Sequence, residues 1–168
     1  LQPRIPEVLR TPSGKIELAP RQIVEDVERL CASLKSVPGQ MVLIGRRDLR
    51  SNNSWMHNLH VLAKGPDRCT LHIHPDDARR LTLASHDMAR VTSNVGSVEV
   101  AVEVTDAIMP GVVSIPHGWG HNQPGTKTEI ASEHAGVNSN ILTDENAIDP
   151  LSGNAILNGI PVVVEKSA

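Results

Sequence analysis

The clearest alternation of apolar and polar residues runs over 96–105. There, one face of an extended chain would carry Val98, Val100, Val102 and Val104. A period of two residues predicts a β-strand with one buried face. The turn residues Asn94-Val95-Gly96 connect this segment to residues 88–93, so we expect a β-hairpin.

Shorter patterns predict the other elements of the chain. We expect strands over 15–18, 41–44, 70–74, 112–115 and 160–164. The 41–44 segment is apolar at every position, which favours a strand buried on both faces. Short helices are expected within 55–63 and from Pro75 onward, where proline and acidic residues suit a first helical turn.

An amphipathic helix is predicted over 21–35 because apolar residues recur there at helical spacing. Its apolar face would comprise Ile23, Val27, Leu30, Cys31 and Leu34, and we expect Cys31 in a core. Residues 116–159 show little periodicity, which indicates a functional or disordered region. The chain therefore reads as mainly β with short helices, and closure into a barrel would remove the strand edges.

The aromatic content is unusual and limits the function classes. In 168 residues the chain has no Phe or Tyr and only two tryptophans, Trp55 and Trp119, so its core must be aliphatic. Base-stacking nucleic-acid modules need surface aromatic side chains, which argues against them. No apolar run approaches the roughly 20 residues of a membrane span.

Charge is unevenly distributed along the chain. Residues 1–60 hold nine Lys and Arg against six Asp and Glu, whereas residues 91–168 hold two against nine. The acidic part argues against a general nucleic-acid or anionic-membrane surface. Cys31 and Cys69 form no zinc spacing or disulfide framework, so we expect a reducing, cytoplasmic compartment.

The first candidate binding segment follows the apolar 41–44 run. Guanidinium groups pair with phosphate, amides and hydroxyls bind heterocycles, and glycine lets a backbone approach a ligand. The residues are Gly45, Arg46, Arg47, Arg50, Ser51, Asn52, Asn53 and Trp55. An ordinary solvated loop is the alternative interpretation.

Two later segments offer a tryptophan plate, amides and a carboxylate. The first is His117-Gly118-Trp119-Gly120; a tryptophan folded into a local core is its alternative explanation. The second contributes Asn138, Asn140, Thr143 and Asp149, whose side chains suit a base edge but also suit Asx turns.

Catalytic motifs are absent from the sequence. It contains no Gly-x-Ser-x-Gly, P-loop or Gly-x-Gly-x-x-Gly pattern. The pairs His72/His74 and His117/His121 leave open a small metal-dependent enzyme, but no carboxylate stands at a matching spacing. The residues therefore favour ligand binding, with no catalytic and no metal-ligating residue assigned.

Taken in order, these segments resemble a known family. The chain is similar to the C-terminal dinucleotide-binding domain of molybdopterin oxidoreductases, which include formate dehydrogenases, nitrate reductases and dimethyl sulfoxide reductases. The resemblance rests on residues 11–18, 43–47 with 52–53 and 57–58, 74–78, 91–96, 109–113 with 116–120, and 138–143 with 149–150.

The resemblance implies a six-stranded double-psi β-barrel that helps hold molybdopterin guanine dinucleotide over a molybdenum or tungsten site. It implies that Gly45 to Asn53 line the pterin and phosphate side, that His117 to Gly120 lie near the pterin, and that Asn138, Asn140 and Asp149 complete the pocket. Residues 1–20 would lead from an upstream catalytic body, and 21–168 would form the barrel domain.

The metal ligand and iron–sulfur cysteines of the family belong to other domains, so we expect this fragment to be inactive alone. Its partners would be the dinucleotide and the upstream domains of the same chain, with no nucleic acid and no membrane span. The alternative is a stand-alone double-psi barrel that uses the 116–159 region to bind a protein partner.

Overall fold

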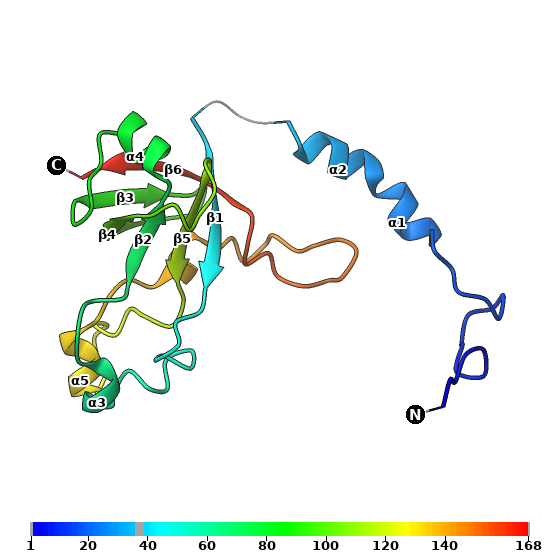
Figure 1. Ribbon diagram of the computed structural model, residues 1–168, viewed down its shortest axis with the longest axis horizontal. Helices are drawn as coiled ribbons and strands as arrows, with labels where there is room; N and C mark the ends of the chain where they lie inside the picture. Colours follow the sequence, from blue (N-terminus) through cyan, green and yellow to red (C-terminus); the bar gives the residue numbers. More distant parts are fainter. Residues whose placement is uncertain (1, 36–38, 168) are drawn as a thin grey trace. The chain divides into compact units, whose positions relative to one another are not determined.

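The computed structural model describes residues 2–35 and 39–167, and the chain divides into two compact units (Figure 1). One unit contains the N-terminal segment up to residue 36 together with Pro150–Gly153. The other contains the remaining residues and holds all six strands.

The N-terminal unit contains two short helices, α1 (Arg21–Glu25) and α2 (Val27–Ser33). The predicted helix is thus confirmed in position but is divided at Asp26. Cys31 is exposed, so its expected place in a core is wrong. The strand expected at 15–18 is also wrong, since those described residues have no strand partner and Leu18 is 92% exposed.

The second unit is a closed barrel with the strand order β1-β5-β2-β4-β3-β6 (Figure 1). Its strands are β1 (Met41–Arg46), β2 (Thr70–Ile73), β3 (Met88–Thr92), β4 (Ser97–Val104), β5 (Val112–Pro116) and β6 (Ile160–Lys166). The predicted hairpin is confirmed, because β3 and β4 pair antiparallel from Met88–Ala101 to Thr92–Ser97.

The pairing of the strands has an internal twofold pattern. β1 runs parallel to β5 and β2 runs parallel to β4, while the other four pairings are antiparallel. Exchanging β1, β2 and β3 for β4, β5 and β6 reproduces every pairing. Each half of the chain therefore inserts a strand into the other half, which confirms the expected six-stranded double-psi barrel.

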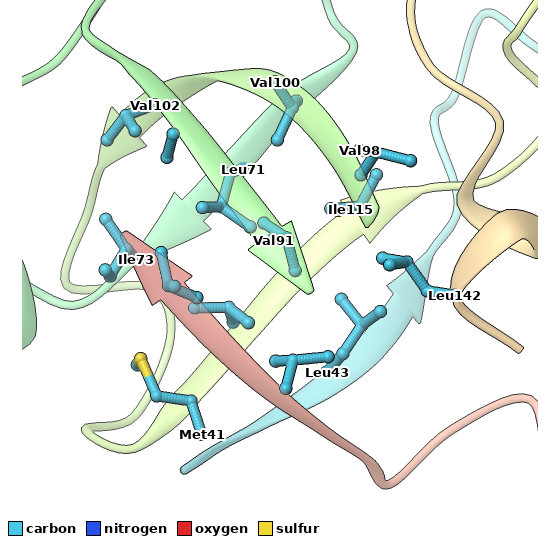
Figure 2. Packing of buried hydrophobic residues seen from close by; sticks show 14 of the residues in the cluster. Met41, Leu43, Leu71, Ile73, Val91, Val98, Val100, Val102, Ile115 and Leu142 are labelled. Atoms are coloured by element: carbon cyan, nitrogen blue, oxygen red, sulfur yellow. The ribbon is translucent and has the colours of Figure 1, made fainter. Parts of the chain in front are cut away.

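The barrel interior is aliphatic, as the missing Phe and Tyr required (Figure 2). Val98, Val100 and Val102 are buried, and Leu142 joins them from the 3₁₀ helix η1 (Ser139–Leu142). Burying one such side chain contributes about 1.5–3 kcal/mol. The closed sheet thus encloses a single core.

Strand β1 departs from its prediction. Met41 and Leu43 are buried, but Val42 and Ile44 are 40% and 37% exposed, so the strand is not buried on both faces. A strand of a closed barrel has only one inner face, and alternate side chains must point outward.

The strand register brings both long connections to one end of the barrel. The last residues of β1 and β5 pair with each other, and β2 and β6 begin beside them. The β1–β2 connection contains α3 (His60–Ala63), which is shorter than the helix expected within 55–63, and the β5–β6 connection contains α5 (Glu129–Glu133) and η1. Helix α4 (Pro75–Arg80) and the β4–β5 turn lie at the opposite end (Figure 1). We call the end that carries the long connections the site end.

Candidate functional site

Close backbone approach holds the two long connections together at the site end. Gly118 has φ +94°, and a Cβ there would overlap the Asn53 carbonyl oxygen. Gly136 likewise lies against Cys69 of the β1–β2 connection and against Trp119, while Gly120 lies against Asn138 within the β5–β6 connection itself. Only glycine permits these approaches at such backbone angles, so the His-Gly-Trp-Gly motif serves first to bring the connections together.

Two histidines and a tryptophan join the same connections. His57 Nδ1 lies 2.7 Å from His121 Nε2, and the His57 ring centroid is 4.1 Å from that of Trp119. Burial lowers the pKa of His57, and nearby His121 lowers it further. Burial also lowers the pKa of His121. Neither histidine is an assigned binding residue, although His57 lies in the 57–58 segment of the family resemblance and His121 pairs with His117 in the metal site that the sequence leaves open. The separation of 64 residues conceals their contact in the sequence.

A polar chain links three residues predicted from sequence. The Arg47 guanidinium donates to Asn53 Oδ1 at 2.9 Å. His117 places Nε2 2.9 Å from the same oxygen and Nδ1 3.1 Å from the Arg46 carbonyl oxygen. Asn53, which has the left-handed φ of 63°, thereby joins the β1–β2 connection to His117 at the start of the β5–β6 connection.

A hollow of about 340 Å³ opens beside this chain, between the ends of β1 and β5 and residues 139–160. The predicted residues that line it are Gly45, Arg46, Arg47, His117, Asn140 and Thr143. Asn158 also lines it and accepts a hydrogen bond from the Gly45 N–H at 2.7 Å. Sequence analysis missed Asn158, for which the only signal was its place before Gly159 and the closing strand.

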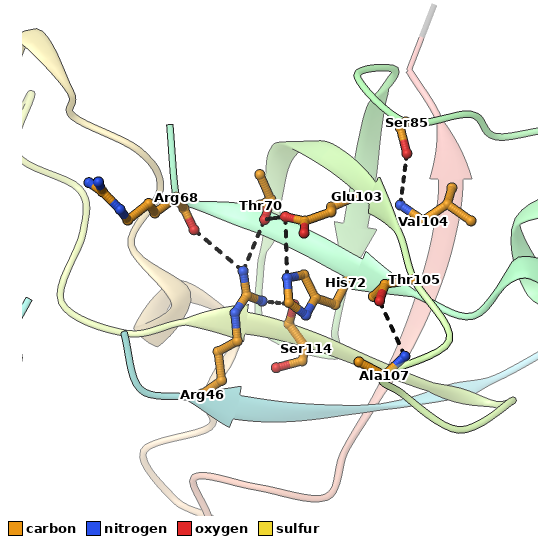
Figure 3. Close-up of polar contacts among 10 residues, drawn as sticks. All are labelled: Arg46, Arg68, Thr70, His72, Ser85, Glu103, Val104, Thr105, Ala107 and Ser114. Atoms are coloured by element: carbon orange, nitrogen blue, oxygen red, sulfur yellow. Dashed lines mark hydrogen bonds and ion pairs between the residues drawn. The ribbon is translucent and has the colours of Figure 1, made fainter. Parts of the chain in front are cut away.

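Arg46 directs its guanidinium along the outer face of the barrel (Figure 3). It donates to the Ser114 carbonyl at 2.8 Å and to Thr70 Oγ1 at 2.9 Å, and Thr70 donates to Glu103. Burial lowers the pKa of Arg46, and the Glu103 carboxylate opposes that effect. The side chain therefore fastens β1 to β5 and β2, while its predicted contact with a phosphate stays a prediction.

A second hollow of about 270 Å³ lies between the β1–β2 connection and residues 133–136. The residues predicted from sequence that line it are Arg50 and Trp119. Its other charged lining groups are Asp48, Asp67, Arg68 and Glu133, so the two signs are mixed. Cys69 also lines it, and burial raises the pKa of that thiol.

Other predicted residues lie outside both hollows. Trp55 is 81% exposed and Ser51 is buried, with its hydroxyl donating to the Asp48 carbonyl. Asn138 caps η1 by accepting from the Asn140 N–H. Asn52 has φ +43°, and its carbonyl accepts from the Trp55 N–H. Asp149 lies in the β5–β6 connection after η1, where its N–H donates to the Asn154 carbonyl.

The described residues contain neither a cluster of metal-ligating side chains nor a membrane-spanning helix. Over 2–35 and 39–167, no group of three or more His, Cys, Asp and Glu side chains lies close enough together to hold a metal ion. Within the same residues, no helix has the length and apolar character needed to cross a membrane.

Comparisons with known proteins agree with the barrel and its motifs. Residues 41–161 match the family model described as "Molydopterin dinucleotide binding domain". Dimethyl sulfoxide/trimethylamine N-oxide reductase of Cereibacter sphaeroides is 30% identical over 66% of this chain and 15% of its own length. A tetrathionate reductase subunit of Salmonella typhimurium is 29% identical over 56% of this chain and 11% of its own length.

A solved structure supports the same fold. Acetylene hydratase from Pelobacter acetylenicus matches 94% of this chain with a TM-score of 0.67 and 22% identity, through 24% of its own length. The chain thus spans less than a quarter of each of these three proteins. Because the family model covers well over half of the residues, this chain belongs to the family of molybdopterin dinucleotide-binding domains.

Proposed function

We propose that this domain helps hold molybdopterin guanine dinucleotide in a molybdenum- or tungsten-dependent oxidoreductase. The observation that carries the proposal is the 340 Å³ hollow, which opens where the two family motifs meet. Its donor set suits an anionic dinucleotide, because guanidinium and imidazole groups bind phosphate and amides bind heterocycles. The bound cofactor would supply the electron transfer itself.

We assign the contacts in three groups. Gly45, Arg47 and Asn53 would face the phosphate and pterin side, with Arg46, Arg50, Ser51, Asn52 and Trp55 as further candidates. His117, Gly118, Trp119 and Gly120 would lie near the pterin, and Asn138, Asn140, Thr143 and Asp149 would complete the pocket. None of these residues is assigned a catalytic role, so the domain alone would be inactive.

Nuclear magnetic resonance of the ¹⁵N-labelled chain tests this function. Guanosine monophosphate, the nucleotide half of the cofactor, should shift amides of residues 45–58 and 116–121 at millimolar concentration, since half of a site binds weakly. Cytidine monophosphate is the matched control for the base. Equal shifts with both nucleotides would remove the guanine assignment, and no shifts with either would count against the site.

We also propose that the chain works with upstream catalytic domains of a longer protein. In this organisation residues 1–20 lead in from those domains and 21–168 form the dinucleotide-binding domain. Helices α1 and α2 support it, because they expose Ile23, Val24, Val27 and Leu30 at 49–56%. An exposed apolar face of this kind marks an interaction surface.

The coding sequence upstream of Leu1 tests this organisation. A continuous frame of several hundred codons with a cysteine cluster would support it, together with an iron–sulfur cluster in the longer protein. A start codon directly before Leu1 would overturn it.

We further propose a cytoplasmic location, since Cys31 and Cys69 are both free thiols.

A further inference from the structure

The contact between His57 and His121 ties together the two connections that form the site end. The two nitrogens lie 2.7 Å apart, so one of them must carry a hydrogen and the other a lone pair. If both rings were imidazolium, both nitrogens would carry hydrogens and the contact would become repulsive. The hydrogen bond therefore exists only while at least one of the two rings is neutral.

The surroundings of the pair favour this less protonated state. His57 is only 9% exposed, and its Nε2 has no hydrogen-bond partner among the described residues. Burial, the partner ring and Arg68 disfavour charge on His57, whereas Asp48 and the Gly118 carbonyl favour it. Burial disfavours charge on His121, and the Gly118 carbonyl again opposes. The other titratable and charged groups around the adjoining hollow are Arg50, Asp67, Cys69, Glu133 and His134.

The same pair determines where Trp119 lies. The His57 and Trp119 rings are tilted by 43° with centroids 4.1 Å apart, and the backbone of Gly136 also lies against the tryptophan ring. Trp119 belongs to the His117–Gly120 motif, which contributes to both hollows. His117 lines the 340 Å³ hollow, and Trp119 lines the 270 Å³ hollow together with His57. Releasing the histidine pair would remove the ring contact on Trp119 and one of the links between the connections, while the contacts of Gly118 and His117 with Asn53 remain.

We propose that His57 and His121 are positioning residues. Their shared hydrogen bond locks the β1–β2 connection to the β5–β6 connection and holds Trp119 in place at the wall of the 270 Å³ hollow. Acidification to the doubly charged pair opens this lock. The lock is a property of the chain itself, while its effect on nucleotide binding rests on the proposed function.

Two variants of one residue separate the hydrogen bond from its titration. His121→Gln keeps a side-chain donor and acceptor but cannot take a proton, whereas His121→Ala removes the contact. The parent chain and both variants carry Trp55→Phe, so that Trp119 is the only tryptophan in each protein and the background is the same in every comparison. Trp119 emission and histidine ring ¹⁵N shifts are then followed from pH 8 to pH 5.

In the parent chain we expect Trp119 emission to change together with protonation of the pair. His121→Gln should keep the emission seen at pH 8 throughout the range, and His121→Ala should show the acid form at every pH. Two rings that titrate independently with ordinary histidine midpoints, or an unchanged Trp119 signal, would overturn the lock.

The affinity for guanosine monophosphate gives the second measurement. Binding by the parent chain should weaken on the order of fivefold to tenfold on acidification, beyond any loss shown by His121→Gln. The Gln variant senses the same titration of the ligand phosphate, so it is the matched control. An equal loss of affinity in both proteins would show that the lock does not position the residues that bind the nucleotide. Absence of binding at any pH would count against the proposed function, while the spectroscopic test still decides the lock.

Discussion

The two ends of the barrel are closed by different means. Opposite the site end, the buried Asp77 carboxylate accepts from the Gly111 N–H at 2.6 Å and from Arg80 at 2.8 Å, and His74 caps α4. At the site end, the connections meet through glycine contacts, side-chain hydrogen bonds and the tilted rings of His57 and Trp119, and two hollows remain beside them. One end is satisfied by its own side chains, whereas the other leaves room and donors for a ligand.

This difference teaches where substitutions should affect stability alone and where they should also affect binding. At the closed end, Arg79 pairs with Asp76 and Arg80 pairs with Asp77 within α4 itself. At the site end the same backbone contacts that hold the fold also shape the hollows. Four predictions test the distinction, beginning with the largest expected effect.

Gly118→Ala should destabilise the chain by roughly 3–5 kcal/mol, because the new Cβ meets the Asn53 carbonyl oxygen at a strained backbone angle. Urea unfolding followed by circular dichroism measures the change. Gly125→Ala is the matched control: Gly125 has φ +87° but no atom within 4 Å of a Cβ. It should cost about 1–2 kcal/mol, and an equal cost for both variants would contradict the close approach.

Asp77→Ala should cost about 1–3 kcal/mol, because it leaves the Gly111 N–H without its carboxylate partner. Guanosine monophosphate binding should be unchanged, since Asp77 lies at the closed end. Exposed Asp106, in the β4–β5 connection, provides the control Asp106→Ala, expected within about 0.5 kcal/mol of the parent. A loss of binding by a stable Asp77→Ala protein would show that the ends are coupled.

Asn158→Ala should cost about 1 kcal/mol, the typical net value of one hydrogen bond, here that to the Gly45 N–H. The Gly45 amide resonance should move. Nucleotide binding should weaken because Asn158 lines the 340 Å³ hollow. Unfolding in urea and the nucleotide titration measure the two effects. Unchanged binding would restrict Asn158 to a structural role.

The pH dependence of stability should be the smallest effect. Burial lowers the folded-state pKa of His57, His72 and His121, so the unfolded chain binds more protons. The free energy of unfolding should therefore fall as the pH drops below about 6.5, the ordinary histidine value, toward the folded-state pKa. Urea unfolding at a series of pH values measures the slope, which His121→Gln should reduce. A flat profile between pH 7 and pH 5 would contradict it.

Much of the fold was predictable from local patterns. The Val98–Val104 alternation and the turn at Asn94 report the backbone period and one-sided burial, and β3 and β4 form there. The same patterns also predict the position of β1 correctly, but they are wrong about its burial on both faces and about a strand at 15–18. An apolar run does not say how many of its faces a closed barrel will cover, and a short alternating segment does not say whether a partner strand exists.

The site was predictable only in part. The ordered motifs identified the two connections that meet at the site end, and Gly45, Arg47 and His117 share a hollow there. They did not predict the direction of Arg46, which depends on the register that sets Ser114 and Thr70 beside it. Trp55 lies in the first connection and yet faces solvent.

The aliphatic, mainly β character of the chain and its family follow from the sequence, because periodicity, composition and motif order are local or linear properties. Only the tertiary structure decided which distant residues meet: His57 with His121 across 64 residues, and Gly45 with Asn158 across 113. Those contacts follow from the parallel pairing of β1 with β5 and the return of β6 beside β1. Strand register across a closed barrel is a property of the whole chain, and no local pattern encodes it.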